Sequence, residues 1–125
     1  MADSVVTIVA RKKMVRARAG ISELPIIKGM AFGDGAVADG NVAVPQPEDA
    51  ALKNELLRKP VDDYKIISDT CIRYSCLLEK QELVGKAINE IALYDADGDL
   101  IAIKSFLPKG KDDDMEMIFE IDDTF

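Results

Sequence analysis

The chain has 125 residues, of which 48% are hydrophobic and 31% are charged, and its formal net charge is −7. This length gives room for one domain, expected over residues 1–125, and the acidic balance argues against binding to nucleic acid or to an anionic membrane surface. Histidine is absent, which removes the commonest general base and the commonest metal ligand. An enzyme is therefore disfavoured, and no cofactor is expected. No stretch approaches the roughly 20 consecutive apolar residues that span a bilayer.

Residues 4–18 predict a helix, with Ser4 or Asp3 as the N-cap and Gly20 as the C-terminal stop. An apolar stripe can form from Val5, Ile8, Val9, Met14 and Val15. Apolar residues precede basic ones in this segment, which is the reverse of a secretory signal, so we expect synthesis in the cytoplasm without export by that route.

Basic residues crowd the second half of the same segment, where the helix dipole favours cations. They are Arg11, Lys12, Arg16 and Arg18. Two interpretations stay open: a docking face for an acidic partner, or a solvated face with favourable dipole placement. We take the four residues as the candidate partner interface.

Residues 25–32 predict a short buried strand that Gly33, Asp34 and Gly35 then interrupt. This tripeptide lacks the GxGxxG spacing and the GK[ST] ending of phosphate loops, so it indicates a tight turn in which the backbone needs the freedom of glycine. Residues 36–49 have no clear period and predict a loop. Residues 48–59 are expected to hold one or two helical turns, closed by Pro60.

The second half of the chain has β character. Strands are expected at residues 64–68 and at 70–80, where Ile72, Tyr74, Cys76 and Leu78 alternate with polar residues. Two more, at 87–94 and 100–106, flank a hairpin turn in which Gly98 supplies a positive φ. The alternation from Met115 to Asp122 predicts a last strand, after a solvated loop at 109–114. The predicted fold class is α+β, with the N-terminal helix packed on one face of a mainly antiparallel sheet of about four to six strands.

Two groups of side chains have the residue types of chemical sites. The turn residues Asp95, Asp97 and Asp99 begin like a calcium loop, but Phe106 stands at the twelfth position, where such a loop needs a glutamate. A tight polar turn explains them better, and weak calcium binding by several acidic turns together stays open. Cys71 and Cys76 are five residues apart, so on a strand they face opposite ways and are expected to be free thiols. No catalytic or metal-binding constellation is found.

Three blocks stand in order along the chain: Phe32-Gly33-Asp34-Gly35, then Ala51-Leu52-Lys53-Asn54-Glu55, then a longer run from Asn89 to Ala102. The run reads Asn89-Glu90-Ile91-Ala92-Leu93-Tyr94-Asp95, followed by Asp97-Gly98-Asp99-Leu100-Ile101-Ala102. Together they resemble the tail-collar fibre domain, the baseplate-proximal N-terminal part of many phage tail fibres. The resemblance extends roughly from Val5 to Ile121.

The resemblance implies a structural role, because members of this family anchor a fibre to the baseplate and contribute no catalytic residues to the motif. It implies homo-oligomers, usually trimers, and a central strand for the Glu90 block. The turn residues that would determine the fold are Gly33, Asp34, Gly35, Asp95, Asp97 and Gly98.

Fibre proteins of this kind usually continue into a shaft and a receptor-binding tip, whereas this sequence ends at Phe125. The interpretation is a stand-alone short version: an adaptor between the baseplate and a fibre or receptor-binding protein. The particle would be a phage or a phage-tail-like particle such as a contractile bacteriocin. Its partners would be other tail and baseplate proteins.

Two rival functions remain. A receptor- or glycan-binding module of the same particle is disfavoured because residues 36–49 and 109–114 contain no aromatic residue. A tail-associated hydrolase is disfavoured by the absence of histidine.

Overall fold

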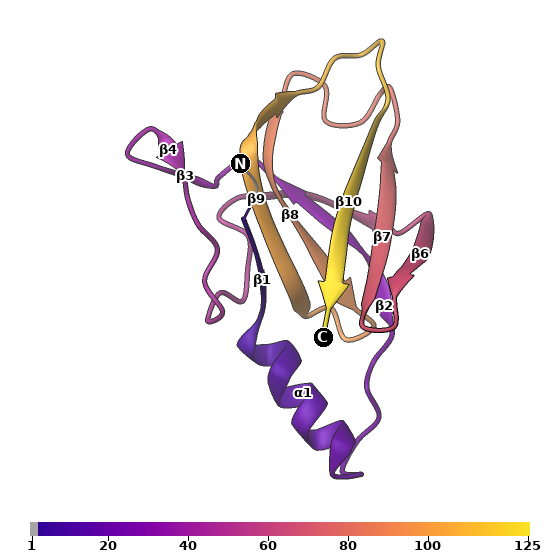
Figure 1. Ribbon diagram of the computed structural model, residues 1–125. Coiled ribbons are helices and arrows are strands. Elements are labelled where there is room, and N and C mark those ends of the chain that lie inside the picture. The colour runs from indigo at the N-terminus through magenta and orange to yellow at the C-terminus, as the bar shows by residue number, and fades with distance from the viewer. Residues whose placement is uncertain (1–2) are drawn as a thin grey trace.

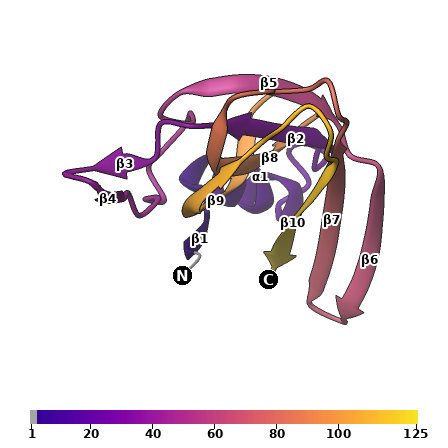
Figure 2. The same ribbon diagram turned by 90° about the horizontal axis from the view of Figure 1, so that it is seen from above.

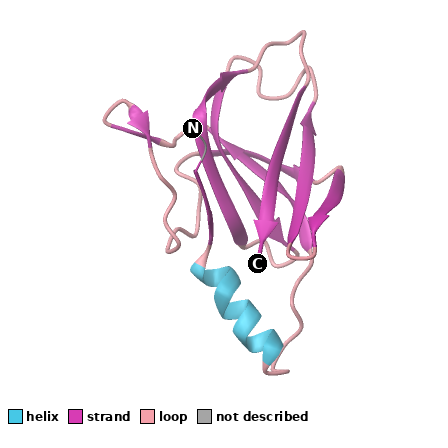
Figure 3. Ribbon diagram, viewed as in Figure 1, coloured by secondary structure: helices cyan, strands magenta, loops and turns pink. Residues whose placement is uncertain are grey.

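The computed structural model describes residues 3–125, and strands dominate it. Of residues 3–125, 51% are strand and 9% are helix, and these strands form three sheets. Figure 3 shows the strands in magenta and the helix in cyan. The predicted α+β class, with a helix covering one face of a sheet, is therefore wrong. The face that the helix was expected to cover is instead packed against a second sheet.

The larger sheet has five antiparallel strands in the order β1-β9-β8-β2-β5 (Figure 1). Their bounds are β1 Asp3–Val6, β2 Ile27–Gly33, β5 Glu55–Pro60, β8 Ala87–Asp95 and β9 Leu100–Gly110. The strand β8 lies at the centre, as the resemblance implied for the Glu90 block. The predicted hairpin between β8 and β9 is confirmed, and Gly98 in its turn has a φ of 86°.

The second sheet has three antiparallel strands in the order β10-β7-β6. They are β6 Asp63–Ser68, β7 Cys71–Leu78 and β10 Met117–Thr124, which confirms the strands predicted there. A small hairpin of β3 (Val37–Ala38) and β4 (Asn41–Val42) projects on the side of the molecule away from β6 (Figure 1). Seen from above, the β6–β7 hairpin stands away from the five-stranded sheet (Figure 2).

The main core lies between these two sheets. Inward side chains of β2, β8 and β9 meet those of β7 and β10, and the ring of Phe119 packs 5.4 Å from that of Phe32 and 5.9 Å from that of Phe106. A smaller cluster on the opposite face of the larger sheet contains Ala92, Ile103 and Leu52. Alternation along each strand distributes the apolar side chains between the two clusters.

The helix α1 (Ile8–Arg18) begins later than the sequence predicted. Its N-cap is Thr7, whose Oγ1 accepts a hydrogen bond from the Ala10 N–H and donates one to the Leu100 carbonyl oxygen. The preceding residues form β1, where Val5 pairs with Ile103 of β9. A run of β-branched residues favours a strand, and the hydroxyl of Thr7 allows the helix to begin only after it. Figure 1 shows α1 extending beyond the end of the sheets.

One other prediction is wrong, and a second is confirmed in part. The helical turns expected at residues 48–59 are replaced by the strand β5, which pairs with β2, and by an irregular segment that buries Leu52. The loop expected at 109–114 is exposed at five of its six residues, but β9 continues to Gly110 and Lys111 is buried. The Lys111 ammonium donates to the carbonyl oxygens of Lys80 and Asp112, at 2.9 and 2.8 Å. These backbone acceptors allow a lysine to be buried at this position.

Candidate partner-binding surfaces

The three sequence blocks that carry the family resemblance meet around one buried carboxylate. Glu90, at the centre of β8, is 2% exposed. Its Oε2 accepts hydrogen bonds from the N–H groups of Gly35 and Asn54, at 3.0 and 2.9 Å, and its Oε1 accepts one from Lys53, at 2.9 Å. The carboxylate therefore joins two loops that are distant in sequence to the central strand.

The neighbouring residue extends this attachment. The Asn89 side chain accepts from the Ala36 N–H at 3.0 Å and donates to the Asp34 carbonyl oxygen at 3.1 Å. The Asn54 amide also donates to the Asp34 carboxylate, at 2.6 Å. These hydrogen bonds hold the two loops on the central strand, so the arrangement is structural.

Close approach of other atoms explains the glycines of this turn. A Cβ at Gly33 would lie 2.5 Å from Glu90 Oε2 and 2.6 Å from the Asn54 carbonyl oxygen, and one at Gly35 would lie 2.7 Å from Asn54 Cβ. Neither glycine has a positive φ. The turn needs glycine for space and not for conformational freedom, so the physical reason inferred from the sequence is wrong.

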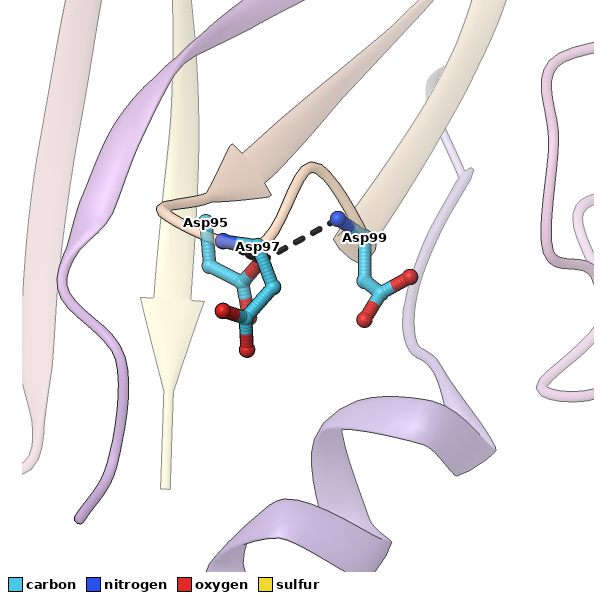
Figure 4. A group of neighbouring side chains, drawn as sticks. All are labelled: Asp95, Asp97 and Asp99. Carbon is cyan, nitrogen blue, oxygen red and sulfur yellow. Dashed lines mark hydrogen bonds between the residues drawn. The ribbon is translucent and has the colours of Figure 1, made fainter.

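The acidic turn between β8 and β9 faces the helix. Figure 4 shows Asp95, Asp97 and Asp99 with their carboxylates on the side of α1. The Lys13 ammonium lies 2.6, 3.1 and 2.8 Å from these three carboxylates in that order. The Asp95 carboxylate also accepts the N–H groups of Asp97 and Asp99.

The acidic turn therefore has a structural role, since its three carboxylates pair with Lys13 of α1. Burial alone would lower the pKa of Lys13, but its hydrogen bonds to the three aspartates outweigh that effect and raise the pKa above the ordinary lysine value. The ammonium lies where a cation shared by these carboxylates would lie, so calcium would have to displace it. Lys13 was not singled out from the sequence, because the residues that it binds are more than eighty positions away.

The outer face of α1 carries the four basic residues of the candidate interface. Arg11, Lys12, Arg16 and Arg18 are all exposed, and among residues 3–125 none of the four forms an ion pair. The inner face holds Ala10, which is buried, and Met14. Residues 4–22 contain five basic and no acidic residues, so a chain of net charge −7 has −12 in the remainder. The molecule is therefore strongly polarised, with a local excess of positive charge on one projecting helix.

A groove opens between the helix and the three-stranded sheet, and we call it the α1 groove. Its volume is about 770 Å³. It is lined by Val6, Ala10, Lys13, Met14, Leu24, Pro25, Ile26, Ile27, Val61, Asp62, Asp63, Tyr64, Ile72, Tyr74, Asp95, Ile101, Asp123 and Phe125. The sequence did not indicate this groove, because its walls come from six separate stretches of the chain that only the fold brings together.

Nothing in the described chain resembles a nucleophilic site. Cys76 is the more buried of the two free cysteines, and burial together with nearby Asp62 raises the pKa of its thiol to about 12. A thiol with so high a pKa is a poor nucleophile at neutral pH. In residues 3–125 no helix has both the length and the apolar character required to cross a membrane.

The comparisons with known proteins agree with a structural role. A family model described as "Phage tail-collar fibre protein, N-terminal" matches residues 1–118. This is a family of structural proteins of the phage tail, which associate with other tail proteins. Searches of the curated proteins and of the solved structures find no significant match.

Proposed function

Because this chain belongs to the phage tail-collar fibre family, we propose that it is an adaptor that attaches a fibre or receptor-binding protein to the baseplate. The particle is a phage or a related contractile particle of the bacteriocin type. The adaptor acts by binding other chains and not by catalysis.

The outer face of α1 is the observation that carries this proposal. Four exposed cations lie on a helix that extends beyond the sheets (Figure 1), and they have no acidic partner within the described chain. An acidic surface on a neighbouring protein would neutralise them and would be steered toward them over a long range. A standard interface of ~800 Å² per partner would include the helix and the adjoining loops.

Copies of the chain associate as well, with the trimer that the family implies as the expected state. The strand β6 supports this part of the proposal, because all six of its residues are exposed and it forms an unprotected edge of its sheet. Monomeric proteins usually protect such edges. Light scattering of the purified chain measures the oligomeric state directly.

Charge reversal of the helix tests the docking surface. The double variant Arg11→Glu and Arg16→Glu is expected to keep the circular dichroism spectrum of the wild type and to lose incorporation into particles. The matched control reverses Lys80 and Lys86, which are exposed in the loop between β7 and β8 at the opposite end of the molecule. Normal incorporation of the helix variant would refute the basic face as the docking surface.

Deletion of the gene distinguishes an adaptor function from a receptor-binding function. Particles that lack an adaptor are expected to lose their fibres, as seen by electron microscopy. Particles that keep their fibres but fail to bind host cells would instead favour a receptor- or glycan-binding module.

A further inference from the structure

The α1 groove has the size of a binding site and an apolar lining. Its volume of about 770 Å³ falls within the range of ligand sites in proteins, roughly 300–1,000 Å³. Its lining includes Ala10 and Met14 of the helix, Ile26 of the segment before β2, and Tyr74 of β7. The C-terminus lies on the same end of the molecule as the helix (Figure 1).

One residue of the groove lacks the partner that its burial requires. Asp123 of β10 is 5% exposed, and its Oδ1 has no hydrogen-bond partner within residues 3–125. It occupies the same face of the strand as Phe119 and Ile121, which are buried in the core. Strand alternation therefore calls for an apolar side chain at this position. A buried carboxylate without a partner is unfavourable, and burial correspondingly raises the pKa of Asp123.

The other carboxylates of the groove already have partners. Lys13 binds Asp95, the Leu77 N–H donates to Asp62, and the Tyr64 N–H donates to Asp63. The groove lining contains these four aspartates and a single basic residue, which is already engaged by the acidic turn. Asp62 and Asp63 are exposed to solvent, so Asp123 is the buried carboxylate of the groove with an unpartnered oxygen, and a cationic group is its natural complement.

The surroundings of the groove favour a polypeptide over a small molecule. Apolar side chains continue from the groove onto the surface, with Ile26 71%, Tyr64 62% and Phe125 64% exposed. Contiguous exposed apolar side chains of this kind mark contact sites for other proteins and extend beyond what a small molecule would cover.

We propose that the α1 groove binds an apolar segment of a different tail protein, and that one lysine or arginine of this segment pairs with Asp123. The inference rests on the proposed function, since it takes the partner to be a second chain of the tail. An adaptor must hold two chains, and this molecule offers two surfaces of opposite character. The outer face of α1 accepts an acidic partner, and the groove accepts an apolar segment with one positive charge.

Two synthetic peptides test the pairing on the full-length protein. The first is acetyl-Ser-Leu-Val-Lys-Val-Leu-Ser-Gly-amide, and the second replaces its lysine with norleucine, which keeps the four side-chain carbons and lacks the terminal ammonium. Affinities are measured by NMR titration, following the amide signals of Ile72 and Tyr74 beside the groove. The lysine peptide is expected to bind about tenfold more tightly than the norleucine peptide.

Three variants test whether the preference for the lysine peptide arises at Asp123 in the groove. Asp123→Asn is expected to remove the preference for lysine, whereas the control Asp122→Asn, which loses a surface ion pair with Arg73, is expected to keep it. Ile26→Arg alters an exposed rim residue, so it does not disturb the core, and its own cation is expected to weaken binding of the lysine peptide.

Several results would overturn the proposal. Equal affinities for the two peptides would do so, as would an unchanged preference in Asp123→Asn or the absence of shifts at the groove. Binding of butylammonium as tight as that of the lysine peptide would identify a small amine as the occupant. A change in the oligomeric state of Asp123→Asn, measured by light scattering, would identify a second copy of the chain.

The outcomes for the two proposals are separable. If the peptides fail but the wild-type chain is present in particles, only the groove proposal fails. If the lysine preference holds but the chain is absent from purified particles, the adaptor function fails while the binding chemistry of the groove stands.

Discussion

Replacement of Glu90 by glutamine tests whether one buried carboxylate holds the loops of the family motif. In the wild type, two N–H groups donate to Oε2 and one to Oε1. A glutamine amide can keep the two bonds at the Oε2 position, but its NH₂ group then faces the Lys53 N–H, and neither can accept. One charge-assisted bond is lost, a buried donor is left without an acceptor, and the two remaining bonds become neutral.

The expected cost follows from these changes. Hydrogen bonds to charged groups contribute about 1.5–3 kcal/mol each, and an unsatisfied buried group costs about 1–3 kcal/mol. Because the amide retains two of the three contacts, we expect Glu90→Gln to lower the free energy of unfolding by about 3 kcal/mol. This loss is a substantial part of the roughly 5–15 kcal/mol that stabilises a typical domain.

Urea unfolding followed by far-ultraviolet circular dichroism measures this difference. The matched control is Glu120→Gln, an exposed position on β10, which is expected to change stability by no more than about 0.5 kcal/mol. Native-state hydrogen exchange should also accelerate at the amides of Gly35, Lys53 and Asn54. A Glu90→Gln protein as stable as the control variant would refute the assignment of this carboxylate as the attachment point of the loops.

Three further predictions concern single side chains. Lys13→Met leaves the buried Asp95 carboxylate without its cation, so we expect the free energy of unfolding to fall by about 2–3 kcal/mol and amide exchange in α1 to become faster. Unchanged exchange in α1 would contradict a role of Lys13 in holding the helix to the acidic turn. The raised pKa of Asp123 means that the folded state holds its proton more tightly than the unfolded state, so the carboxylate costs stability above its folded-state pKa. In urea unfolding at neutral pH, Asp123→Asn should therefore have a free energy of unfolding about 1 kcal/mol higher than that of the wild type. This difference should shrink as the pH falls through the folded-state pKa. A difference that stays constant with pH would contradict its assignment to the buried carboxylate. Cys76 should resist iodoacetamide at neutral pH until urea unfolds the protein, as mass spectrometry of the labelled peptides would report, and rapid labelling of the native protein would count against its burial.

Local patterns predicted those strands whose signals lie within a few residues. Alternation around Tyr74 and Phe119, and the turn residues between β8 and β9, were enough to place the strands of the second half. The start of the helix was misplaced because Val5 and Val6 pair with β9, about one hundred residues later in the chain. Propensity also favoured a helix near Leu52, but pairing with β2 makes the following segment a strand.

The candidate surfaces also divide into those that local sequence indicates and those that depend on contacts between distant segments. Arg11 and Arg16 could be proposed from the sequence, because charge is visible in composition and a basic segment is recognised without knowledge of its neighbours. The role of Glu90 and the pairing of Lys13 could not be proposed, because each depends on atoms from loops distant in the chain. The role of Asp123 could not be proposed either, because the alternation along β10 does not indicate that this residue borders a groove.

The amino-acid sequence by itself determined the kind of molecule: an acidic chain without histidine, with β-rich local patterns and three motif blocks of a tail-fibre family. Only the tertiary structure decided that two sheets pack face to face, that the helix extends beyond them, and that an apolar groove holds an unpaired carboxylate. The physical reason is the range of the interactions. Turns and strand alternation depend on neighbours in the chain, whereas sheet pairing, burial and the compensation of charge depend on neighbours in space.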